Sequence, residues 1–152
     1  MRIFVDTNII TEYLEERAQA DLVDRIFEQS EQKDWERYIS VGSFYTITYL
    51  TERFLRHQGI VQPQLAQQQC YILTTLLETF NVQDLDKQAL IEGVSNLAFL
   101  DLEDSYQNQA ALRADCDVLL TINKKDFKRI VDEKVIVLTP QEFIDRFQVH
   151  YH

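Results

Sequence analysis

The sequence predicts an α/β fold in which a mainly parallel sheet lies between helical layers. Short apolar runs of strand length alternate with longer segments of helical periodicity. Strands that alternate with helices are joined by right-handed crossovers, and such crossovers build a parallel sheet. The chain has 152 residues, of which 45% are hydrophobic, and we expect a single domain over residues 1–152.

The first half of the chain contains two predicted strands and three predicted helices. The apolar run Ile3–Val5 predicts the first strand. Apolar residues at helical spacing predict two helices over residues 8–32, and Tyr38–Val41 is typical of a short strand. Because Ser favours helix starts and Gly favours helix ends, we expect the next helix to be capped by Ser43 and to end at Gly59.

The second half repeats the alternation of helices and strands. Pro63 suits the first turn of a helix that continues to about Leu77. A short strand over Phe80–Val82 and a helix from about Lys87 to Leu97 are expected next. The segments LEDSYQNQAALRADC and QEFIDRF predict two more helices, and DVLLTIN and KVIVLTP predict two more strands.

The charge balance restricts a nucleic-acid role. Fifteen Lys and Arg against 25 Asp and Glu give a formal net charge of −10, opposite to the usual charge of a nucleic-acid-binding protein. Such a role therefore needs divalent cations that neutralise carboxylates, or a local basic patch. Lys124, Lys125, Lys128 and Arg129 form a candidate patch, and the alternative is a solvated surface.

Several classes of protein are disfavoured by what the sequence lacks. No apolar run approaches the roughly 20 residues that cross a bilayer, and the N-terminus lacks signal-peptide features, so we expect a cytoplasmic protein without a membrane partner. Glycine-rich nucleotide-binding motifs and a G-x-S-x-G elbow are absent. The three histidines, His57, His150 and His152, lie in a helix end and a tail, which disfavours a histidine-based site.

Acidic and amide residues occur at places that a parallel sheet would bring together. Asp6 directly follows the first strand, Glu103 and Asp104 open a helix, and Asn123 and Asp126 follow the strand DVLLT. Ligands of open α/β sheets bind at the carboxyl ends of the strands, and oxygen ligands suit Mg²⁺ or Mn²⁺. This spacing is typical of a metal-dependent phosphodiesterase. The alternative is that these residues only cap helices and form turns.

The segments MRIFVDTNII, DLEDSYQNQAALRADCDVLLTINKKDF and VIVLTPQEFI, in this order, resemble the PIN-domain family of ribonucleases. That family includes the VapC toxins of bacterial toxin–antitoxin pairs. The resemblance covers the whole chain and is most specific in its last third. It implies a three-layer α/β/α sandwich that holds one or two Mg²⁺ or Mn²⁺ ions and hydrolyses RNA with a metal-activated water. It also implies an antitoxin protein as a partner.

The resemblance assigns roles to individual residues of this chain. Asp6, Glu103, Asp104 and Asp126 would be catalytic. Asp6, Asp104, Asn123 and Asp126 would hold the metal ion. Glu103 would serve as the general base.

Three further residues are expected to act through these ligands. Asn8 would support Asp6 by a hydrogen bond, and Thr121 would orient the loop that follows its strand. Thr46 stands where many PIN nucleases have a Glu, and Thr is a poor metal ligand. Glu52 lies about 120° away from it on the same helix and cannot simply substitute. This departure favours an alternative: a weakly active or inactive PIN scaffold that binds RNA or protein.

The sequence is also compatible with a different role for Asp6 and with an interface formed by aromatic residues. In a receiver-type or dehalogenase-like phosphoryl-transfer domain, Asp6 would be the nucleophile, although this chain has DTN where dehalogenase-like enzymes have D-x-D. Five aromatic residues are expected to pack in the core, and a homodimer or antitoxin interface is the alternative for them. These residues are Phe44, Tyr45, Tyr49, Phe54 and Tyr71.

Overall fold

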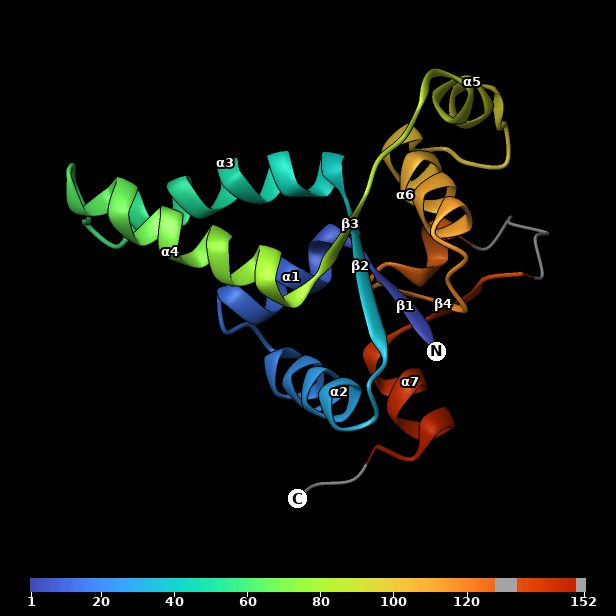
Figure 1. Ribbon diagram of the computed structural model, residues 1–152, viewed down its shortest axis with the longest axis horizontal. Helices are drawn as coiled ribbons and strands as arrows, with labels where there is room; N and C mark the ends of the chain where they lie inside the picture. Colours follow the sequence, from blue (N-terminus) through green and yellow to red (C-terminus); the bar gives the residue numbers. More distant parts are fainter. Residues whose placement is uncertain (128–133, 150–152) are drawn as a thin grey trace.

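The apolar runs form a five-stranded, fully parallel sheet between two layers of helices (Figure 1). The computed structural model describes residues 1–127 and 134–149. The strands are β1 (Arg2–Val5), β2 (Glu36–Ser40), β3 (Asn81–Gln83), β4 (Val118–Leu120) and β5 (Ile136–Leu138). The predicted α/β class and its three-layer α/β/α arrangement are confirmed.

Helices connect β1 to β2, β2 to β3 and β3 to β4, and a 3-10 turn, Lys124–Phe127, follows β4. In the described ranges the helices are α1 (Thr7–Leu14), α2 (Ala20–Gln32), α3 (Val41–His57), α4 (Gln64–Thr79), α5 (Lys87–Ser95), α6 (Leu102–Arg113) and α7 (Pro140–Phe147). The sequence therefore predicted each of these α-helices, with ends displaced by a few residues.

The strand order, β3-β2-β1-β4-β5, creates a switch point between β1 and β4. From β1 the chain proceeds outward to β2 and β3, and it then returns to the other side of β1 with β4 and β5. In the register of the sheet, Phe4 pairs with Tyr38 on one side and with Leu119 on the other. Ligands of open α/β sheets bind at such a switch point, beyond the carboxyl ends of the strands. Asp6 and Thr121 are the residues that directly follow β1 and β4 there.

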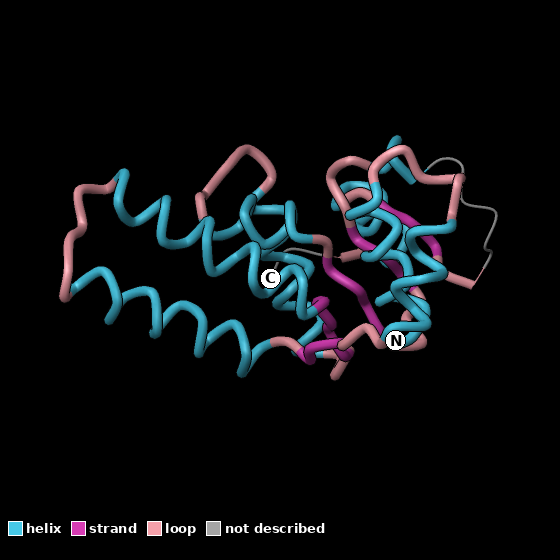
Figure 2. The backbone as a smooth tube through the Cα atoms, turned by 90° about the horizontal axis from the view of Figure 1, so that it is seen from above, coloured by secondary structure: helices cyan, strands magenta, loops and turns pink. Residues whose placement is uncertain are grey.

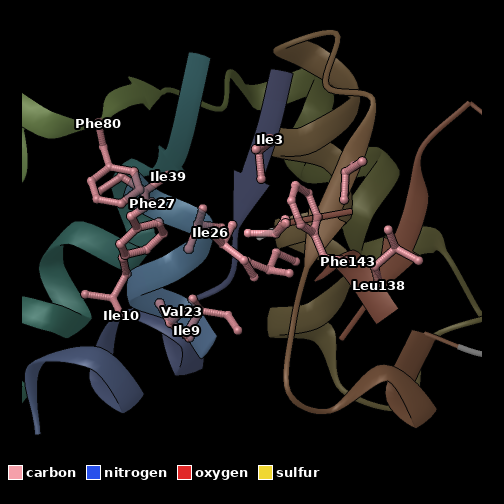
Figure 3. Close-up of a cluster of buried hydrophobic side chains, with 14 of the residues drawn as sticks. Ile3, Ile9, Ile10, Val23, Ile26, Phe27, Ile39, Phe80, Leu138 and Phe143 are labelled. Carbon is pink, nitrogen blue, oxygen red and sulfur yellow. The ribbon is translucent and has the colours of Figure 1, made fainter. Parts of the chain in front are cut away.

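Each face of the sheet has its own hydrophobic core. Ile3 and Val5 of β1 point to one face, where they pack with residues of α1, α2, α3, α4 and α7 (Figure 3). Phe4 points to the opposite face and packs with Leu119, Phe99 and the alanines of α6. Burial of a large apolar side chain contributes about 1.5–3 kcal/mol. The two cores thus fix the carboxyl ends of β1 and β4 from both faces of the sheet.

Helices α3 and α4 extend away from the sheet as an antiparallel hairpin (Figures 1 and 2). The predicted cap of α3 is wrong by three residues: the Ser40 hydroxyl accepts the Ser43 N–H at 2.9 Å, so Ser40 is the cap. At the other end, Gly59 has a φ of 80°, and the Ile60 N–H donates to Leu55 O at 3.1 Å. Glycine adopts this left-handed conformation without steric penalty, which agrees with the helix end predicted there.

The prediction of core packing is wrong for the three tyrosines among the five aromatic residues. Tyr45, Tyr49 and Tyr71 are 69%, 63% and 75% exposed, whereas Phe44 and Phe54 are half-buried. The physical reason is that the tyrosines lie on the solvent faces of the α3–α4 hairpin. No helix in residues 1–127 and 134–149 is long and apolar enough to cross a membrane.

Candidate metal and substrate site

The Asp6 carboxylate is buried and fixed by donors from three parts of the chain. Its Oδ1 accepts the Thr7 N–H at 2.8 Å at the start of α1, and the Gln107 Nε2 of α6 at 3.0 Å. Its Oδ2 accepts the Thr121 hydroxyl at 2.8 Å. Asp6 therefore caps α1, as one interpretation of the sequence held, and at the same time joins α1 to α6 and to the end of β4.

Gln107 is the residue of this network that sequence reasoning missed. It is buried, and its Nε2 also lies 2.7 Å from the Ser43 hydroxyl, while its Oε1 accepts the Ser40 hydroxyl at 2.6 Å. The sequence offers only a general signal, because α6 has no apolar stripe; the structure shows that Ser105, Gln107 and Gln109 are among its buried residues. A polar helix packed against a sheet must satisfy its buried polar groups by hydrogen bonds.

Asn8 and Thr121 belong to the same network, but Asn8 reaches Asp6 only indirectly. The Asn8 Nδ2 donates to the Thr121 hydroxyl at 3.3 Å, and that hydroxyl donates to Asp6. The Asn8 Oδ1 accepts the Ile122 N–H at 3.3 Å. The Thr121 hydroxyl also accepts the Asn123 N–H at 3.2 Å. Thr121 thus connects the loop after β4 to the carboxylate after β1.

A second group of carboxylates lies at the start of α6. Asp101 caps this helix, accepting the Glu103 N–H at 2.9 Å. Partial burial, followed by the charges of Asp6, Asp101, Asp126 and Glu103, raises the pKa of Asp104 to about 7. Because carboxylates from three separate segments act on Asp104, the topology brings the predicted residues Asp6, Glu103 and Asp126 into its surroundings, and Asp101 joins them.

Glu103 shares this environment although much of its surface is exposed. Partial burial and the charges of Asp101 and Asp6 raise the pKa of its carboxyl. A carboxylate with a raised pKa takes up a proton more readily at neutral pH than an ordinary surface Glu.

Asn123 and Asp126 lie at the outer side of the site and are exposed. The Asp126 N–H donates to Asn123 O at 3.0 Å, which starts the 3-10 turn. Asp126 lies inside this turn, which agrees with the turn-forming part of the alternative interpretation of the sequence.

The predicted basic patch beside this turn is only partly described. Lys124 is paired with Glu142 of α7 at 2.7 Å, and Lys125 is exposed. Lys128 and Arg129 lie outside the described residues. The ion pair with Glu142 offsets the charge of Lys124.

The donor set suits a hard, oxygen-preferring cation. No three Asp, Glu, His or Cys side chains of the described part of the chain are placed to hold an ion directly. Mg²⁺, however, usually retains several waters and binds through one or two carboxylates. Asp104 accepts no hydrogen bond from any described residue through its carboxylate, so both oxygens stay available for such a cation. The residues therefore fit a cation that is held partly through water.

Thr46 lies at the edge of this site and is turned back toward its own helix. Its hydroxyl donates to Gly42 O at 3.2 Å. Thr46 and Gly42 line a pocket of about 310 Å³ together with Glu103 and Gln107. Glu52 pairs with Arg56 at 2.9 Å further along α3 and does not line this pocket, in agreement with its predicted position on another face.

Comparisons with known proteins agree with this architecture. VapBC2 from Rickettsia felis, bound to a promoter DNA fragment, is 17% identical over 91% of this chain and 98% of its own, with a TM-score of 0.68. VapBC-1 from nontypeable Haemophilus influenzae is 18% identical over 93% and 99% of the two chains, with a TM-score of 0.66. DNA-bound VapBC from Salmonella typhimurium is 16% identical over 92% and 98%, with a TM-score of 0.67. At these identities the likeness establishes a shared fold.

No curated protein matches the chain significantly. The PIN domain, whose family members are generally nucleases, matches residues 2–125, which include β1 to β4 and the residues around Asp6 and Asp104. Because this match covers most of the 152 residues, the chain belongs to the PIN-domain family.

Proposed function

We propose that this protein is a cytoplasmic endoribonuclease that depends on Mg²⁺ or Mn²⁺ and acts as the toxin of a toxin–antitoxin pair. One observation carries the proposal: the Asp104 carboxyl, with a pKa raised to about 7, lies within the electrostatic reach of Asp6 and Asp126 at the carboxyl edge of the sheet. Uncompensated carboxylates destabilise a fold, and they are typical of sites that bind a cation or transfer protons.

Asp6, Asp104, Asn123 and Asp126 are the residues that would hold the cation. A bound Mg²⁺ or Mn²⁺ makes water more acidic and offsets the charge that develops on a phosphodiester during hydrolysis. The hydrogen bonds from Gln107 and Thr121 keep Asp6 in one orientation and prevent it from rotating away.

Glu103 is the proposed general base. Its raised pKa makes its carboxylate a stronger base toward the attacking water than an ordinary surface Glu. Attack of water in line with the 3′-oxygen would leave a 5′-phosphate and a 3′-hydroxyl. No side chain needs to act as a nucleophile. Asp6 is buried and already accepts three hydrogen bonds, which disfavours the phosphoryl-transfer alternative in which it attacks phosphorus.

An antitoxin partner is supported by a second surface of the molecule. A pocket of about 400 Å³ between α1, α2 and α4 has an apolar lining that includes Phe27 and Leu76. Asp24, Glu28 and Glu31 lie at the same pocket. Apolar grooves with charged rims suit an amphipathic helix of opposite charge. An antitoxin segment with apolar and basic residues is therefore the expected occupant.

RNA cleavage tests the enzymatic proposal. Purified protein is incubated with mixed structured and single-stranded RNAs in the presence of Mn²⁺, Mg²⁺ or EDTA. We expect cleavage with either cation, none with EDTA, and none with Asp104→Asn. The exposed Asp145→Asn on α7 is the matched control and retains activity. Full activity of Asp104→Asn would contradict the assigned site.

A weakly active or inactive binding scaffold is the second candidate function. The observation that favours it is Thr46, because its hydroxyl is used by Gly42 and it offers no carboxylate to the pocket that it shares with Glu103. A scaffold of this kind would bind RNA without cleaving it under any cation. Calorimetric titration with Mn²⁺ separates the two functions, since a site without catalytic capacity is expected to bind the cation poorly.

A further inference from the structure

The exposed face of α3 carries aromatic and basic residues at helical spacing. Tyr45, Tyr49, Arg53 and His57 follow one another at intervals of four residues. Tyr45 and Tyr49 are 69% and 63% exposed, and Arg53 and His57 are exposed as well. We call these four residues the α3 track. In Figure 1, α3 extends from the end of β2 toward the tip of the α3–α4 hairpin.

The α3 track continues the face of α3 that borders the acidic site. At about 100° per residue, Tyr49, Arg53 and His57 fall within an arc of about 80° that includes Thr46, and Tyr45 lies about 40° beyond Tyr49. Gly42 falls within the same arc, and Gly42 and Thr46 line the pocket that contains Glu103. A ligand on this face would extend about 16 Å along the helix, from Thr46 to His57.

The charge of the α3 track is opposite to that of the chain as a whole. Arg53 forms no ion pair with any residue of the described ranges. Arg56, which is paired with Glu52, borders the track, and an open hollow of about 400 Å³ is lined by Tyr49, Glu52, Arg53, Arg56 and His57. The protein has a net charge of −10, yet here the Arg53 guanidinium lies beside exposed tyrosine rings. This combination suits binding of a negatively charged ligand with aromatic groups better than self-association through an apolar surface.

We propose that the α3 track binds single-stranded RNA and leads it to the pocket that Thr46 and Glu103 line. Bases would stack on Tyr45 and Tyr49, the Arg53 guanidinium would pair with a phosphate, and His57 would donate a hydrogen bond to the backbone. Stacking platforms combined with basic side chains are a general mode of single-strand binding that tolerates many sequences. This inference deepens the proposed ribonuclease function and rests on it.

RNA binding and RNA cleavage are measured separately to test the α3 track. Fluorescence anisotropy of a short labelled single-stranded RNA in EDTA gives Kd without cleavage. Tyr49→Ala should raise Kd at least about five-fold, whereas Tyr49→Phe, which keeps the ring, should bind like the parent. Arg53→Gln should reduce the slope of log Kd against log salt by about 0.7. Tyr71→Ala on α4 and Arg146→Gln on α7 are matched exposed controls and should change neither quantity.

The outcomes separate the α3 track from the ribonuclease itself. Metal-dependent cleavage with unchanged Kd in Tyr49→Ala and Arg53→Gln overturns the track and leaves the enzyme intact. Absence of both RNA binding and cleavage in the parent protein overturns the proposed function. Light scattering adds a third result: if Tyr49→Ala converts a dimer to a monomer without affecting RNA binding, the face is a self-association surface and the track is rejected.

Discussion

The Asp104 side chain is half-buried near four other carboxylates, and this environment favours its protonated form. The proposed cation site requires the ionised form. With a pKa of about 7 in the folded chain and an ordinary value of 3.8, the folded state binds this proton more tightly than the unfolded state between those values. Stability linked to Asp104 therefore falls as pH rises from about 4 to about 7.

Asp104→Asn is accordingly expected to stabilise the protein while it abolishes cleavage. At pH 8 the free energy of unfolding should rise by about 1–2 kcal/mol, a value reduced for solvent screening of this partly exposed group. At pH 4 the gain should nearly vanish, because the parent carboxyl is then largely protonated. Urea unfolding at both pH values measures this, with Asp145→Asn as control. An equal effect at both pH values would show that Asp104 is not perturbed by its neighbours.

Gln107 provides the corresponding prediction for the neutral part of the site. Gln107→Leu removes a donor to Asp6 and to the Ser43 hydroxyl and the acceptor of the Ser40 hydroxyl, all of them buried. Loss of partners for buried polar groups costs about 1–3 kcal/mol. Chemical denaturation should show this loss, whereas Gln67→Leu on the exposed face of α4 should unfold like the parent. An unchanged midpoint for Gln107→Leu would mean that the network contributes no stability.

Among the residues of the site, the sequence pointed to Asp6 and Thr121 but not to Gln107. A polar residue that directly follows an apolar strand has a predictable place at the sheet edge, as Asp6 and Thr121 do. Gln107 lies in the middle of a polar helix, and its partners on α1 and α3 are distant in sequence. Several polar residues of α6 could face those partners. The choice among them depends on how α6 is rotated about its own axis, and the local periodicity of the sequence does not determine that rotation.

Helix α3 is the element in which local sequence signals were least reliable. Ser40 and Ser43 are both suitable caps, and only the hydrogen bond from the Ser43 N–H to Ser40 distinguishes them. Ser43 is instead buried beside Gln107. The end of the same helix was predictable because Gly59 supplies a left-handed conformation that few other residues adopt readily.

The start of α3 also allows a gain-of-function prediction. Thr46→Glu would add a carboxylate to the pocket that contains Glu103, and would therefore increase the affinity for Mn²⁺ and the rate of RNA cleavage. Thr46→Gln has the same length without the charge and is the matched control. Calorimetry with Mn²⁺ and a cleavage assay measure both effects. Equal behaviour of the two variants would show that position 46 does not contribute to the cation site.

For the whole molecule, alternating strand and helix patterns were sufficient to predict the α/β class, because each pattern is local. The strand order is a property of the complete chain: it places β1 beside both β2 and β4, and so brings Asp6 to Thr121 and near Asp104. The projection of the α3–α4 hairpin beyond the sheet could not be inferred from periodicity, since buried and exposed helix faces can have similar aromatic content.

Cation binding should stabilise the whole molecule in a pH-dependent way. A ligand at 100 times its Kd stabilises the folded state by about 2.7 kcal/mol if it does not bind the unfolded chain. At pH 8, where Asp104 is ionised in the folded protein, Mn²⁺ should raise Tm; at pH 5.5 the proton on Asp104 should compete with it and reduce the shift. Calorimetric melting with NaCl at matched ionic strength controls for screening of the net charge of −10.

Asp104→Asn should lose the Mn²⁺-specific part of the shift in Tm. A shift of the same size with NaCl, or in Asp104→Asn, would show that the cation acts on the surface charge of the molecule and not at the sheet edge.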